Sequence, residues 1–312
     1  MSRFALVTGA AGFLGYHLCL ALQAAGWSVM AVDSFAELPY PAELKRQRAA
    51  LLWTRGIDVV ELDVRTDAME RIVMHGATVF HLAALAGVRT SFDNADAYLT
   101  TNVLGTRRVL EWALRNDARR IVYASSSSVK TNLSLYAASK VATEAIMQAA
   151  ETDIETIGLR YHTVYGPWGR PDMAVWTMAE RVLAGEVITV YGDGEAERDF
   201  THVDDVIRAT LRAAEGRLSG SVDERGSTMT RPAIDVGAGG TRRVVDLIRL
   251  LAEGLRKPCP EIIPKPSPPG DQASSRARTD HQHRLLGIRP SDFLPLDAGI
   301  PGFCRWLLER QA

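Results

Sequence analysis

Two side chains four residues apart, Tyr136 and Lys140, are the pair in this sequence best suited to acid–base chemistry. If the segment around them is helical, residues four apart project from one face, so the two side chains can act together. A tyrosine hydroxyl has an ordinary pKa of about 10, and a nearby ammonium group stabilises the phenolate that must form if the oxygen is to act as a base. The pair therefore predicts proton removal from a substrate near neutral pH.

A run of four serines, residues 125–128, follows the apolar segment 121–124. That segment is typical of a buried strand, and ligands of parallel α/β sheets bind at the carboxyl ends of the strands. We expect these hydroxyls to polarise the same substrate oxygen as the tyrosine. A Tyr-x-x-x-Lys pair also arises by chance on surface helices, but the glycine-rich turn near the amino terminus disfavours that interpretation.

The glycine-rich turn, residues 9–15, reads Gly-Ala-Ala-Gly-Phe-Leu-Gly directly after the apolar segment 4–7. Glycines there allow the chain to turn sharply, to approach a pyrophosphate with bare backbone, and to pack a helix against the sheet. Tight strand-to-helix turns need glycine in any case, but the position after a first buried strand favours dinucleotide binding. The residues expected at the cofactor are Gly9, Gly12, Phe13, Leu14 and Gly15.

Asp33 ends the second apolar strand, where a carboxylate can accept hydrogen bonds from both ribose hydroxyls and would repel a 2′-phosphate. This position favours NAD over NADP. The alternative is that Asp33 only caps the next turn with Ser34. Asp63 and Val64, after the third strand, are candidates for the adenine edge, and a turn-forming aspartate is an equally good interpretation.

The elements that must position these groups alternate between strands and helices. Strand-like segments are expected at 4–7, 27–33, 57–62, 78–82, 120–124 and 154–159, with helices at 16–25, 41–53, 95–116 and 137–151. The alternation predicts an α/β fold with a Rossmann-like, doubly wound parallel sheet.

After residue 166 the pattern changes to shorter elements. Helices are expected near 174–184, 203–215 and 243–255, and a strand at 188–191. We assign 1–165 to an NAD-binding domain and 166–312 to a smaller C-terminal α/β lobe that binds substrate, with some segments returning to the first domain. The proline-dense segment 258–269 is interpreted as a rigid surface segment of that lobe.

The composition is that of an ordinary globular chain, with 46% hydrophobic and 23% charged residues among 312. A formal net charge of −1 gives no general field for nucleic acid or an anionic membrane, and neither partner is expected. The first apolar run, 4–7, is too short for a signal sequence or a membrane span, so we expect a cytoplasmic protein.

Cysteine and histidine usage gives no sign of a metal site. The cysteines, Cys19, Cys259 and Cys304, are far apart and odd in number, and we expect them to be buried apolar residues. His281 and His283 lie beside an arginine-rich stretch and are interpreted as solvated surface. No metal is predicted.

Taken in chain order, these motifs resemble the extended short-chain dehydrogenases/reductases, in the branch of nucleotide-sugar epimerases, decarboxylases and dehydratases. The resemblance implies a catalytic triad of Ser126, Tyr136 and Lys140, of which the tyrosine and lysine also contact NAD. Helices at 95–116 and 137–151 would form a homodimer. The motifs that carry the resemblance are Thr8 with the glycine turn, Asp33, Asp63-Val64, His81 to Ala84, Asn102, the serines, Tyr136 to Lys140 and Arg198 to Asp205, with Ala83, Ala84 and Asn102 implied to contact the cofactor or brace the active site.

Within that branch, segments 86–89 and 160–174 are similar to UDP-glucuronate 4-epimerases. The similarity implies NAD-dependent C4 epimerisation of a UDP-sugar, UDP-glucuronate to UDP-galacturonate, through a transient 4-keto intermediate. An arginine such as Arg170 can hold the sugar carboxylate bidentately, the alternative being an ion pair with Asp172. The residues implied to bind substrate are Arg89, Ser127, Ser128, Thr163, Arg170, Met173, Arg198 (otherwise paired with Glu197 or Asp199) and Asp271.

The sequence departs from that branch in two places. Only residues 129–135 separate Ser128 from Tyr136, where the branch has a longer excursion, and a shorter one could admit water or release a keto product. His162 replaces a phenylalanine, either as a plain aromatic substitute or as a hydrogen-bonding group. The alternatives are a UDP-glucuronate decarboxylase or keto-sugar-releasing enzyme, a UDP-glucose or UDP-N-acetylglucosamine 4-epimerase, and a non-catalytic NAD sensor.

Overall fold

The computed structural model describes residues 3–131, 134–192, 194–216, 233–266 and 274–311. The chain forms two compact units. The first comprises Met1–Arg160, Ile207–Ile234 and Leu285–Gly287, and the second comprises Tyr161–Val206, Asp235–Arg284 and Ile288–Ala312.

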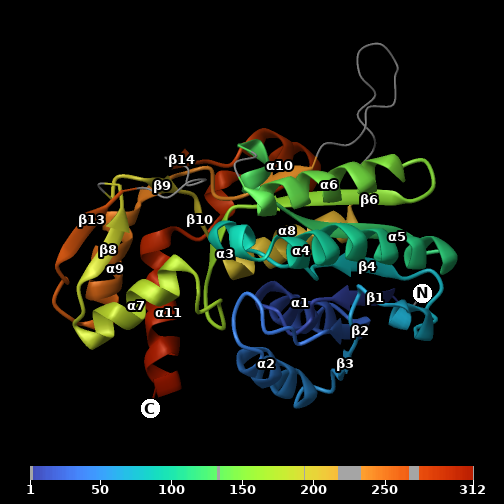
Figure 1. Cartoon of the computed structure of the whole chain (residues 1–312), viewed down its shortest axis with the longest axis horizontal. Helices are drawn as coiled ribbons and strands as arrows, with labels where there is room; N and C mark the ends of the chain where they lie inside the picture. The colour runs from blue at the N-terminus through green and yellow to red at the C-terminus, as the bar shows by residue number, and fades with distance from the viewer. Residues whose placement is uncertain (1–2, 132–133, 193, 217–232, 267–273, 312) are drawn as a thin grey trace, which may run out of the picture. The chain divides into compact units, whose positions relative to one another are not determined.

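The largest sheet has seven strands in the order β11-β6-β5-β4-β1-β2-β3 (Figure 1). The strand β1 pairs in parallel with β2 and β4, and β4 pairs in parallel with β5. This confirms the predicted α/β fold with a Rossmann-like sheet. The strands are β1 (Arg3–Thr8), β2 (Trp27–Asp33), β3 (Val59–Glu61), β4 (Thr78–His81), β5 (Arg120–Ser126), β6 (Glu155–Tyr161) and β11 (Ile234–Val236).

Helices cover both faces of this sheet in the first unit. On one face, α5 and α6 bury Val109, Trp112 and Met147 against Leu6 and Ile121 of the strands. Figure 1 shows α1 and α2 on the other side of the sheet from these two helices. The helices of this region are α1 (Phe13–Ala24), α2 (Glu43–Trp53), α3 (Val88–Asp93), α4 (Ala95–Tyr98), α5 (Gly105–Arg115) and α6 (Leu135–Ala149).

The helix expected at 95–116 is interrupted. Between α4 and α5, residues Leu99–Leu104 form a π-helical turn, which inserts one extra residue into a helical turn. The segment 95–115 is helical as predicted. The π-helical turn inside it was not predicted, because apolar periodicity averaged over a long window does not reveal such a local widening.

The second unit contains short strands in three small sheets, ordered β10-β7, β12-β9-β14 and β13-β8. The strand β13 lies within the proline-dense segment and pairs in parallel with β8, so this segment is held to the unit by main-chain hydrogen bonds. The remaining elements are β7 (Thr163–Tyr165), α7 (Ala174–Ala184), β8 (Ile188–Tyr191), β9 (Glu197–Arg198), β10 (Phe200–His202), α8 (Val203–Glu215), β12 (Arg242–Arg243), α9 (Val244–Leu255), β13 (Ile262–Lys265), β14 (Ser274–Ser275), α10 (Thr279–Leu286) and α11 (Leu296–Gln311).

Asp199 ties the short strands of the second unit together. Its buried carboxylate accepts hydrogen bonds from the backbone N–H groups of Ala238, Gly239 and Ala277, at 3.0, 2.8 and 3.1 Å. A buried carboxylate is stable only when such donors surround it, and here the donors come from two separate loops. The loops of this unit are therefore fixed by one side chain.

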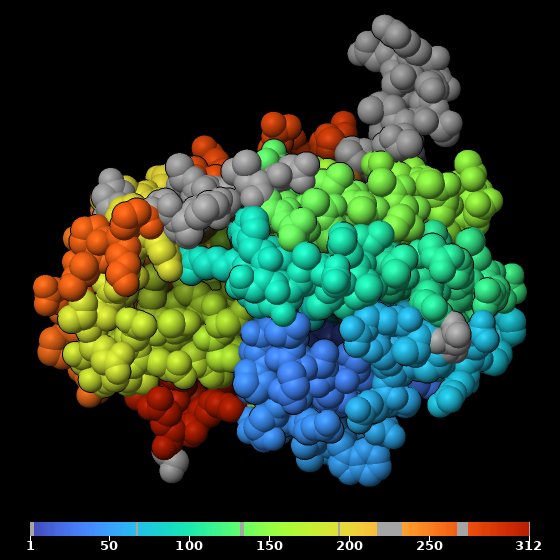
Figure 2. Space-filling model, viewed as in Figure 1, coloured from blue at the N-terminus to red at the C-terminus, as the bar shows by residue number. Residues whose placement is uncertain are grey.

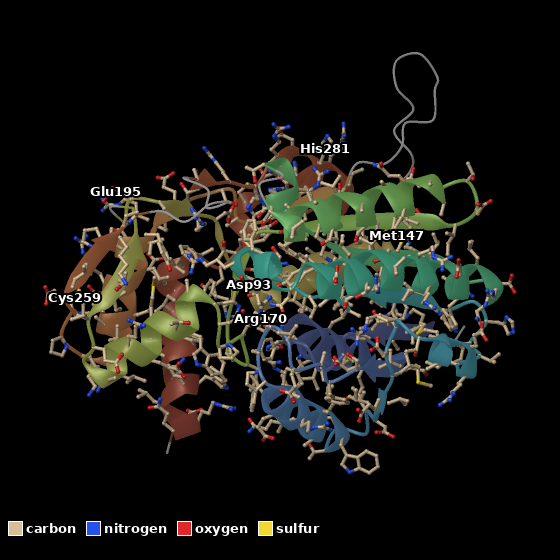
Figure 3. All side chains as sticks on the ribbon, viewed as in Figure 1. Asp93, Met147, Arg170, Glu195, Cys259 and His281 are labelled. Carbon is tan, nitrogen blue, oxygen red and sulfur yellow. The ribbon has the colours of Figure 1, made fainter. Side chains whose placement is uncertain are left out.

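The cysteines are only partly as expected. Cys19 and Cys304 are buried, whereas Cys259 is exposed on the surface of the second unit (Figure 3), so the expectation of burial is wrong there. Cys259 is flanked by Pro258 and Pro260, which cannot continue the preceding helix, and the chain leaves the packed surface at this point. Within the part of the chain that the structure describes, no helix is both long and apolar enough to cross a membrane.

Leu6 provides a test of this core. Its side chain is fully buried in the cluster between β1 and the α5–α6 layer, so Leu6→Ala should lower the free energy of unfolding by about 2–5 kcal/mol. Leu114→Ala on α5 is the matched control, because Leu114 is 38% exposed and should cost well under half as much. Urea unfolding followed by circular dichroism measures both, and equal losses would contradict the assignment of this core.

Candidate active site

The helix α6 presents the predicted Tyr136–Lys140 pair. The helix starts after Ser134, whose hydroxyl accepts a hydrogen bond from the Ala137 N–H at 3.1 Å. Lys140 is buried, and its Nζ donates to the carbonyl oxygen of Ala124 at 2.8 Å. Tyr136 lies one turn before Lys140, half-buried. The hydrogen bond therefore ties this face of α6 to the carboxyl end of β5.

Burial lowers the pKa of Lys140 to about 8, and the negative charge of Glu144 opposes that shift. His81 on β4 is also buried, and burial, with a smaller contribution from Lys140, lowers its pKa to about 3. The imidazole is thus neutral near pH 7, and its nitrogens lie 2.8 Å from the Thr8 hydroxyl and 3.0 Å from the Thr106 hydroxyl. Of these two groups, Lys140 is the one that can carry a positive charge beside the end of β5.

Ser126 is the last residue of β5 and caps the short 3₁₀ helix Ser127–Lys130. Its hydroxyl accepts a hydrogen bond from the Ser128 N–H at 3.2 Å, which fixes the direction of the serine run. Ser127 and Ser128 are half-buried. The three serines predicted at the site therefore leave the carboxyl end of the strand to which Lys140 is bonded.

Asn102 lies in the π-helical turn and is fully engaged with protein. Its amide oxygen accepts from the Leu85 N–H at 2.8 Å, and its amide nitrogen donates to the Leu85 carbonyl and to the Ser139 hydroxyl, both at 2.9 Å. Ser139 precedes Lys140 on α6. Of the two roles implied for Asn102, these contacts correspond to the bracing of the active site.

The glycine-rich turn is packed too closely for side chains. Gly9 has φ +72°, and a Cβ there would lie 2.7 Å from the Ala83 nitrogen. A Cβ on Gly15 would lie 2.1 Å from the Gly9 carbonyl oxygen. Gly12 is the N-cap of α1 and has no side chain to cap the first turn, which holds Phe13 and Leu14. A helix amino terminus of this kind is suited to an anion such as a pyrophosphate.

Asp33 lies at the end of β2 beside this turn. Its two carboxylate oxygens accept from the N–H groups of Ala11, at 3.0 Å, and Phe35, at 2.9 Å. Burial raises the pKa of Asp33, while these hydrogen bonds and the nearby Lys45 and Arg48 oppose the increase. Asp33 thus shapes the turn, and each oxygen keeps acceptor capacity for a ribose hydroxyl.

Arg48 was not anticipated from the sequence. It is completely buried, and its guanidinium donates to the Ala11 carbonyl at 3.2 Å and to the Tyr40 hydroxyl at 2.9 Å. These contacts fasten α2 to the glycine-rich turn. The sequence shows only an arginine among other charged residues of α2. Nothing in it distinguishes a buried arginine from a solvent-exposed one.

The pair predicted for the adenine edge has local roles. Asp63 accepts from the Arg65 N–H at 2.8 Å and pairs with the Arg65 guanidinium at 2.6 Å. Although burial opposes it, these contacts lower the pKa of Asp63. Val64 is buried in the core. The turn-forming interpretation describes Asp63 well. Ala83 and Ala84 are half-buried after β4, and the Ala83 N–H donates to the Thr8 hydroxyl at 3.2 Å.

The residues implied to bind substrate are divided between the units. Arg89, Ser127 and Ser128 belong to the first unit and Thr163, Arg170, Met173 and Arg198 to the second, while Asp271 lies outside the described residues. Arg170 forms a bidentate ion pair with Asp172 at 3.0 and 2.6 Å, which is the alternative that its sequence neighbours raise. Arg198 donates to the Glu197 carbonyl at 2.9 Å.

The loop that carries Arg170 is anchored by aromatic side chains. Trp168 has φ +57°, and its ring lies 5.7 Å from that of Trp306 on α11. The Arg310 guanidinium lies 4.9 Å from the centre of the Trp168 ring. Such cation–π and aromatic contacts hold the loop in a backbone conformation that costs energy for a bulky residue.

His162 is buried inside the second unit. Its Nδ1 lies 3.1 Å from the Ser275 hydroxyl, and its Nε2 lies 3.7 Å from the carboxylate of Asp235. The histidine therefore lies between Ser275 on β14 and Asp235 on β11, so it is more than an aromatic substitute. On α10, Gln282 lies between His281 and His283. Its side chain is buried, and its amide oxygen accepts a hydrogen bond from the Gly237 N–H. No metal-binding cluster occurs among the described residues.

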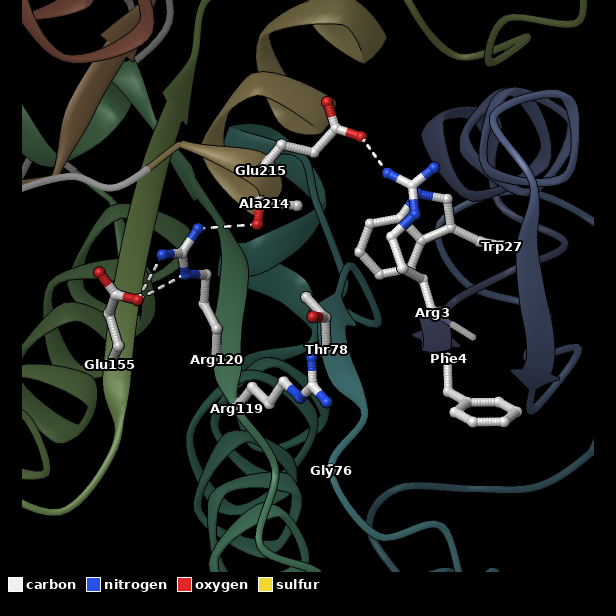
Figure 4. A pocket seen from close by; sticks show the side chains of 10 residues that line it. All are labelled: Arg3, Phe4, Trp27, Gly76, Thr78, Arg119, Arg120, Glu155, Ala214 and Glu215. Carbon is white, nitrogen blue, oxygen red and sulfur yellow. Dashed lines mark hydrogen bonds and ion pairs between the residues drawn. The ribbon is translucent and has the colours of Figure 1, made fainter. Parts of the chain in front are cut away.

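A cavity of about 510 Å³ lies away from these groups, at the amino ends of the strands (Figure 4). The first residues of five strands line it, Arg3, Trp27, Thr78, Arg120 and Glu155. Two ion pairs lie in its lining, Arg3 with Glu215 at 2.6 Å and Arg120 with Glu155 at 2.5 Å. Because α/β folds bind substrates at the opposite ends of the strands, this cavity is not the candidate active site.

Gly15 tests the cofactor end. In Gly15→Ala the new methyl group would force the first turn of α1 away from the Gly9 carbonyl, so NAD binding should weaken by tenfold or more. Gly302→Ala on α11 is the control, since nothing lies within 4 Å of a Cβ at that position. Isothermal titration with NAD measures both variants, and wild-type affinity in Gly15→Ala would contradict the proposed cofactor turn.

Comparisons with known proteins agree with this geometry. Residues 5–224 match the model of the NAD dependent epimerase/dehydratase family. UDP-glucuronate 4-epimerase 3 of Arabidopsis thaliana is 36% identical over 97% of this chain and 76% of its own length. The UDP-glucuronic acid 4-epimerase of Bacillus cereus, solved with UDP-glucuronic acid and NAD, is 29% identical with a TM-score of 0.87, over 99% of this chain and all of its own. The UDP-glucose 4-epimerase of Thermotoga maritima, solved with UDP-glucose, is 27% identical with a TM-score of 0.85 and the same coverage. The chain belongs to the NAD-dependent epimerase/dehydratase family, whose structural relatives bind NAD and UDP-sugars.

Proposed function

We propose that the chain catalyses NAD-dependent C4 epimerisation of UDP-glucuronate to UDP-galacturonate through a transient 4-keto sugar. The observation that most supports this is the buried Lys140 on the same helix face as Tyr136, bonded to the end of the strand that continues into Ser126. This arrangement supplies a base, a cation to stabilise it and a hydroxyl that polarises the substrate oxygen.

In the proposed mechanism, Tyr136 takes the proton from the C4 hydroxyl and later returns it. Lys140 stabilises the phenolate, and Ser126 donates a hydrogen bond to the reacting oxygen. NAD, held by the glycine-rich turn and Asp33, supplies reversible hydride acceptance at C4. The keto sugar turns over between the two transfers and receives the hydride on its other face, so there is no net oxidation.

The keto intermediate is a β-keto acid, which loses carbon dioxide when its carboxylate aligns with the carbonyl π-system. We propose that Ser127, Ser128, Thr163 and Arg170 hold the carboxylate out of that alignment. For Arg170 this requires exchange of its partner Asp172 for the sugar carboxylate, and both are bidentate contacts of one type. Arg89, Met173, Arg198 and Asp271 complete the proposed sugar-nucleotide site.

Two alternative reactions of the same site remain distinguishable. A decarboxylase or a keto-sugar-releasing enzyme shares the first step. The family resemblance implies an acidic residue at the position of Ser128 in the decarboxylases and dehydratases, and this chain has a serine there. A UDP-glucose or UDP-N-acetylglucosamine 4-epimerase shares the whole cycle without the carboxylate, and the arginine and serines at the proposed carboxylate site speak for UDP-glucuronate. A non-catalytic NAD sensor would not require the intact triad.

We also propose a homodimer in which α4, α5 and α6 meet their copies. Figure 2 shows these helices side by side on one face of the first unit, coloured cyan to green. Large apolar side chains on these helices and on the π-helical turn between α4 and α5 are exposed, including Leu99, Leu104 and Val141 at 44%, 49% and 39%. Exposed apolar side chains gathered on one surface are typical of interfaces.

All three cysteines are free, which is compatible with the cytoplasmic location that we propose.

The product of the reaction is the direct test. Purified protein incubated with UDP-glucuronate and NAD should yield UDP-galacturonate of unchanged mass, detected by NMR and mass spectrometry. A product lighter by carbon dioxide would instead identify a decarboxylase. Conversion of UDP-glucose but not of UDP-glucuronate would overturn the proposed substrate, and no conversion of any UDP-sugar would favour a sensor.

Tyr136→Phe tests the proposed base. Loss of the phenol oxygen should reduce turnover by at least about a thousandfold, in the range expected for an acid–base group, with NAD affinity nearly unchanged. Steady-state kinetics and NAD titration measure the two effects. Activity close to wild type in this variant would be incompatible with the mechanism.

A further inference from the structure

Glu144 lies outside the proposed triad, yet its carboxylate joins its own helix α6 to the strands β5 and β6. The carboxylate accepts a hydrogen bond from the Ser125 hydroxyl on β5 at 2.5 Å. It also accepts both arms of the Arg160 guanidinium on β6, at 2.8 and 2.7 Å. Glu144 is buried and follows Lys140 by one turn of α6. One carboxylate thus connects the catalytic helix with two neighbouring strands.

We propose that Glu144 is a positioning residue for the reaction: with Arg160, it holds the serine run in place beneath the substrate and keeps the ammonium group of Lys140 charged. This inference rests on the proposed function, because it concerns the same site. It adds a role for a glutamate that touches neither the proposed substrate nor the cofactor.

The positional part of this role follows from the order of residues along β5. Ser125, which donates to Glu144, directly precedes Ser126, and the Ser126 hydroxyl in turn accepts from the Ser128 N–H. Ala124, immediately before Ser125, is the carbonyl partner of Lys140. Loss of the Glu144 contact therefore frees the strand end at the point where it meets both the lysine and the reacting serine.

The electrostatic part follows from what surrounds the lysine. Lys140 faces the neutral His81 from β4, the Ala124 carbonyl from β5, and Tyr136 and Glu144 from its own helix. Glu144 is the neighbour whose negative charge raises the pKa of Lys140 against the effect of burial. A carboxylate one helical turn away therefore favours the charged lysine that a phenolate needs.

The groups that face Glu144 surround its carboxylate with donors and one neutral phenol. Arg160 faces it from β6, Lys140 from α6, and Ser125 and Tyr123 from β5. Burial and the charge of Glu144 raise the pKa of Tyr123, so this phenol stays neutral over the working range. The bidentate arginine and the serine hydroxyl satisfy the carboxylate oxygens, as a buried carboxylate requires.

The other ends of the same two strands provide a matched control. Arg120 and Glu155, the first residues of β5 and β6, form an ion pair of 2.5 Å beside the cavity in Figure 4. This pair also joins β5 to β6, and its side chains are 12% and 26% exposed, against 25% and 9% for Arg160 and Glu144. It lies at the edge of the sheet away from Lys140. Loss of its charge should affect stability without affecting the site.

The experiment compares Glu144→Gln with Glu155→Gln in the full chain, saturated with NAD, using UDP-glucuronate from pH 6 to pH 10. In Glu144→Gln the pKa of Lys140 should fall below its value of about 8, because the opposing charge is gone. The alkaline limb of the pH–kcat profile should then move to lower pH. A fall of one pKa unit would reduce kcat by about fivefold at pH 8 and by about tenfold at pH 9 and above. Glu155→Gln should keep the wild-type profile and a kcat within about twofold of wild type. Glu144→Asp, which retains the charge, should restore the alkaline limb.

A second measurement does not depend on the substrate. The chain has few lysines, Lys45, Lys130, Lys140, Lys257 and Lys265, so NMR of protein labelled with ¹³C at the lysine ε-carbon can follow the titration of Lys140. The signal of Lys140 should titrate at lower pH in Glu144→Gln than in Glu155→Gln or the wild type. An unchanged titration, or equal kinetic losses in both variants that track their unfolding temperatures, would overturn the proposal. If wild-type protein does not convert UDP-glucuronate, the proposed function fails, and the titration still decides the role of Glu144.

Discussion

The hydrogen bond from Lys140 to the carbonyl oxygen of Ala124 places an ammonium group inside the protein, where a charge is costly. Most of the site can be understood as the arrangement that makes this charge tolerable and useful. A strand end supplies the carbonyl, a neutral histidine on the next strand avoids a second positive charge, and a glutamate one turn along the helix supplies a counter-charge. In the proposed mechanism, the same cation stabilises the phenolate of Tyr136, one turn before the lysine.

The glycine-rich turn depends on close packing of the backbone. Gly9 and Gly15 leave no room for side chains because the turn, β4 and the start of α1 meet there. Asp33 and Arg48 stabilise this arrangement from the side, one by accepting from Ala11 and the other by donating to its carbonyl. The proposed cofactor turn is thus fixed by close backbone packing and by the side chains of Asp33 and Arg48.

Sequence periodicity predicted the sheet and its helices well because a parallel sheet covered on both faces requires continuous apolar strands and amphipathic helices. The segments at 27–33, 174–184, 188–191 and 203–215 have the bounds expected for them. Apart from β8, the short strands of the second unit were not anticipated. The strands β9 and β12 have two residues each, too few for a period to be visible in the sequence. Asp199, directly after β9, accepts hydrogen bonds from Ala238 and Gly239 in the loop before β12.

The position of a side chain could be predicted where the residue belongs to a local motif. It could not be predicted where its contact is with a residue distant in the sequence. The placement of Tyr136, Lys140, Ser126 and Asp33 follows from strand and helix geometry. The links from Glu144 to Ser125 and Arg160, and from His162 to Ser275, join residues 16 to 113 positions apart, so no local pattern announces them. Arg170 shows the reverse case, since its near neighbour Asp172 is its partner in the structure.

The π-helical turn at Leu99–Leu104 sets the angular phase between two stretches of one long helix. A turn widened by one residue rotates everything after it, so the face that α4 presents and the face that α5 presents are offset from a regular spiral. Asn102 points inward toward Leu85 and Ser139, while Leu99 and Leu104 at the borders of the turn point outward. The spacing of six residues thus links two properties that look unrelated, the bracing of the catalytic helix and the pattern of apolar side chains on the outer surface. Insertions and deletions in this turn would alter both at once, which makes its length a stronger constraint on sequence change than the identity of most residues within it.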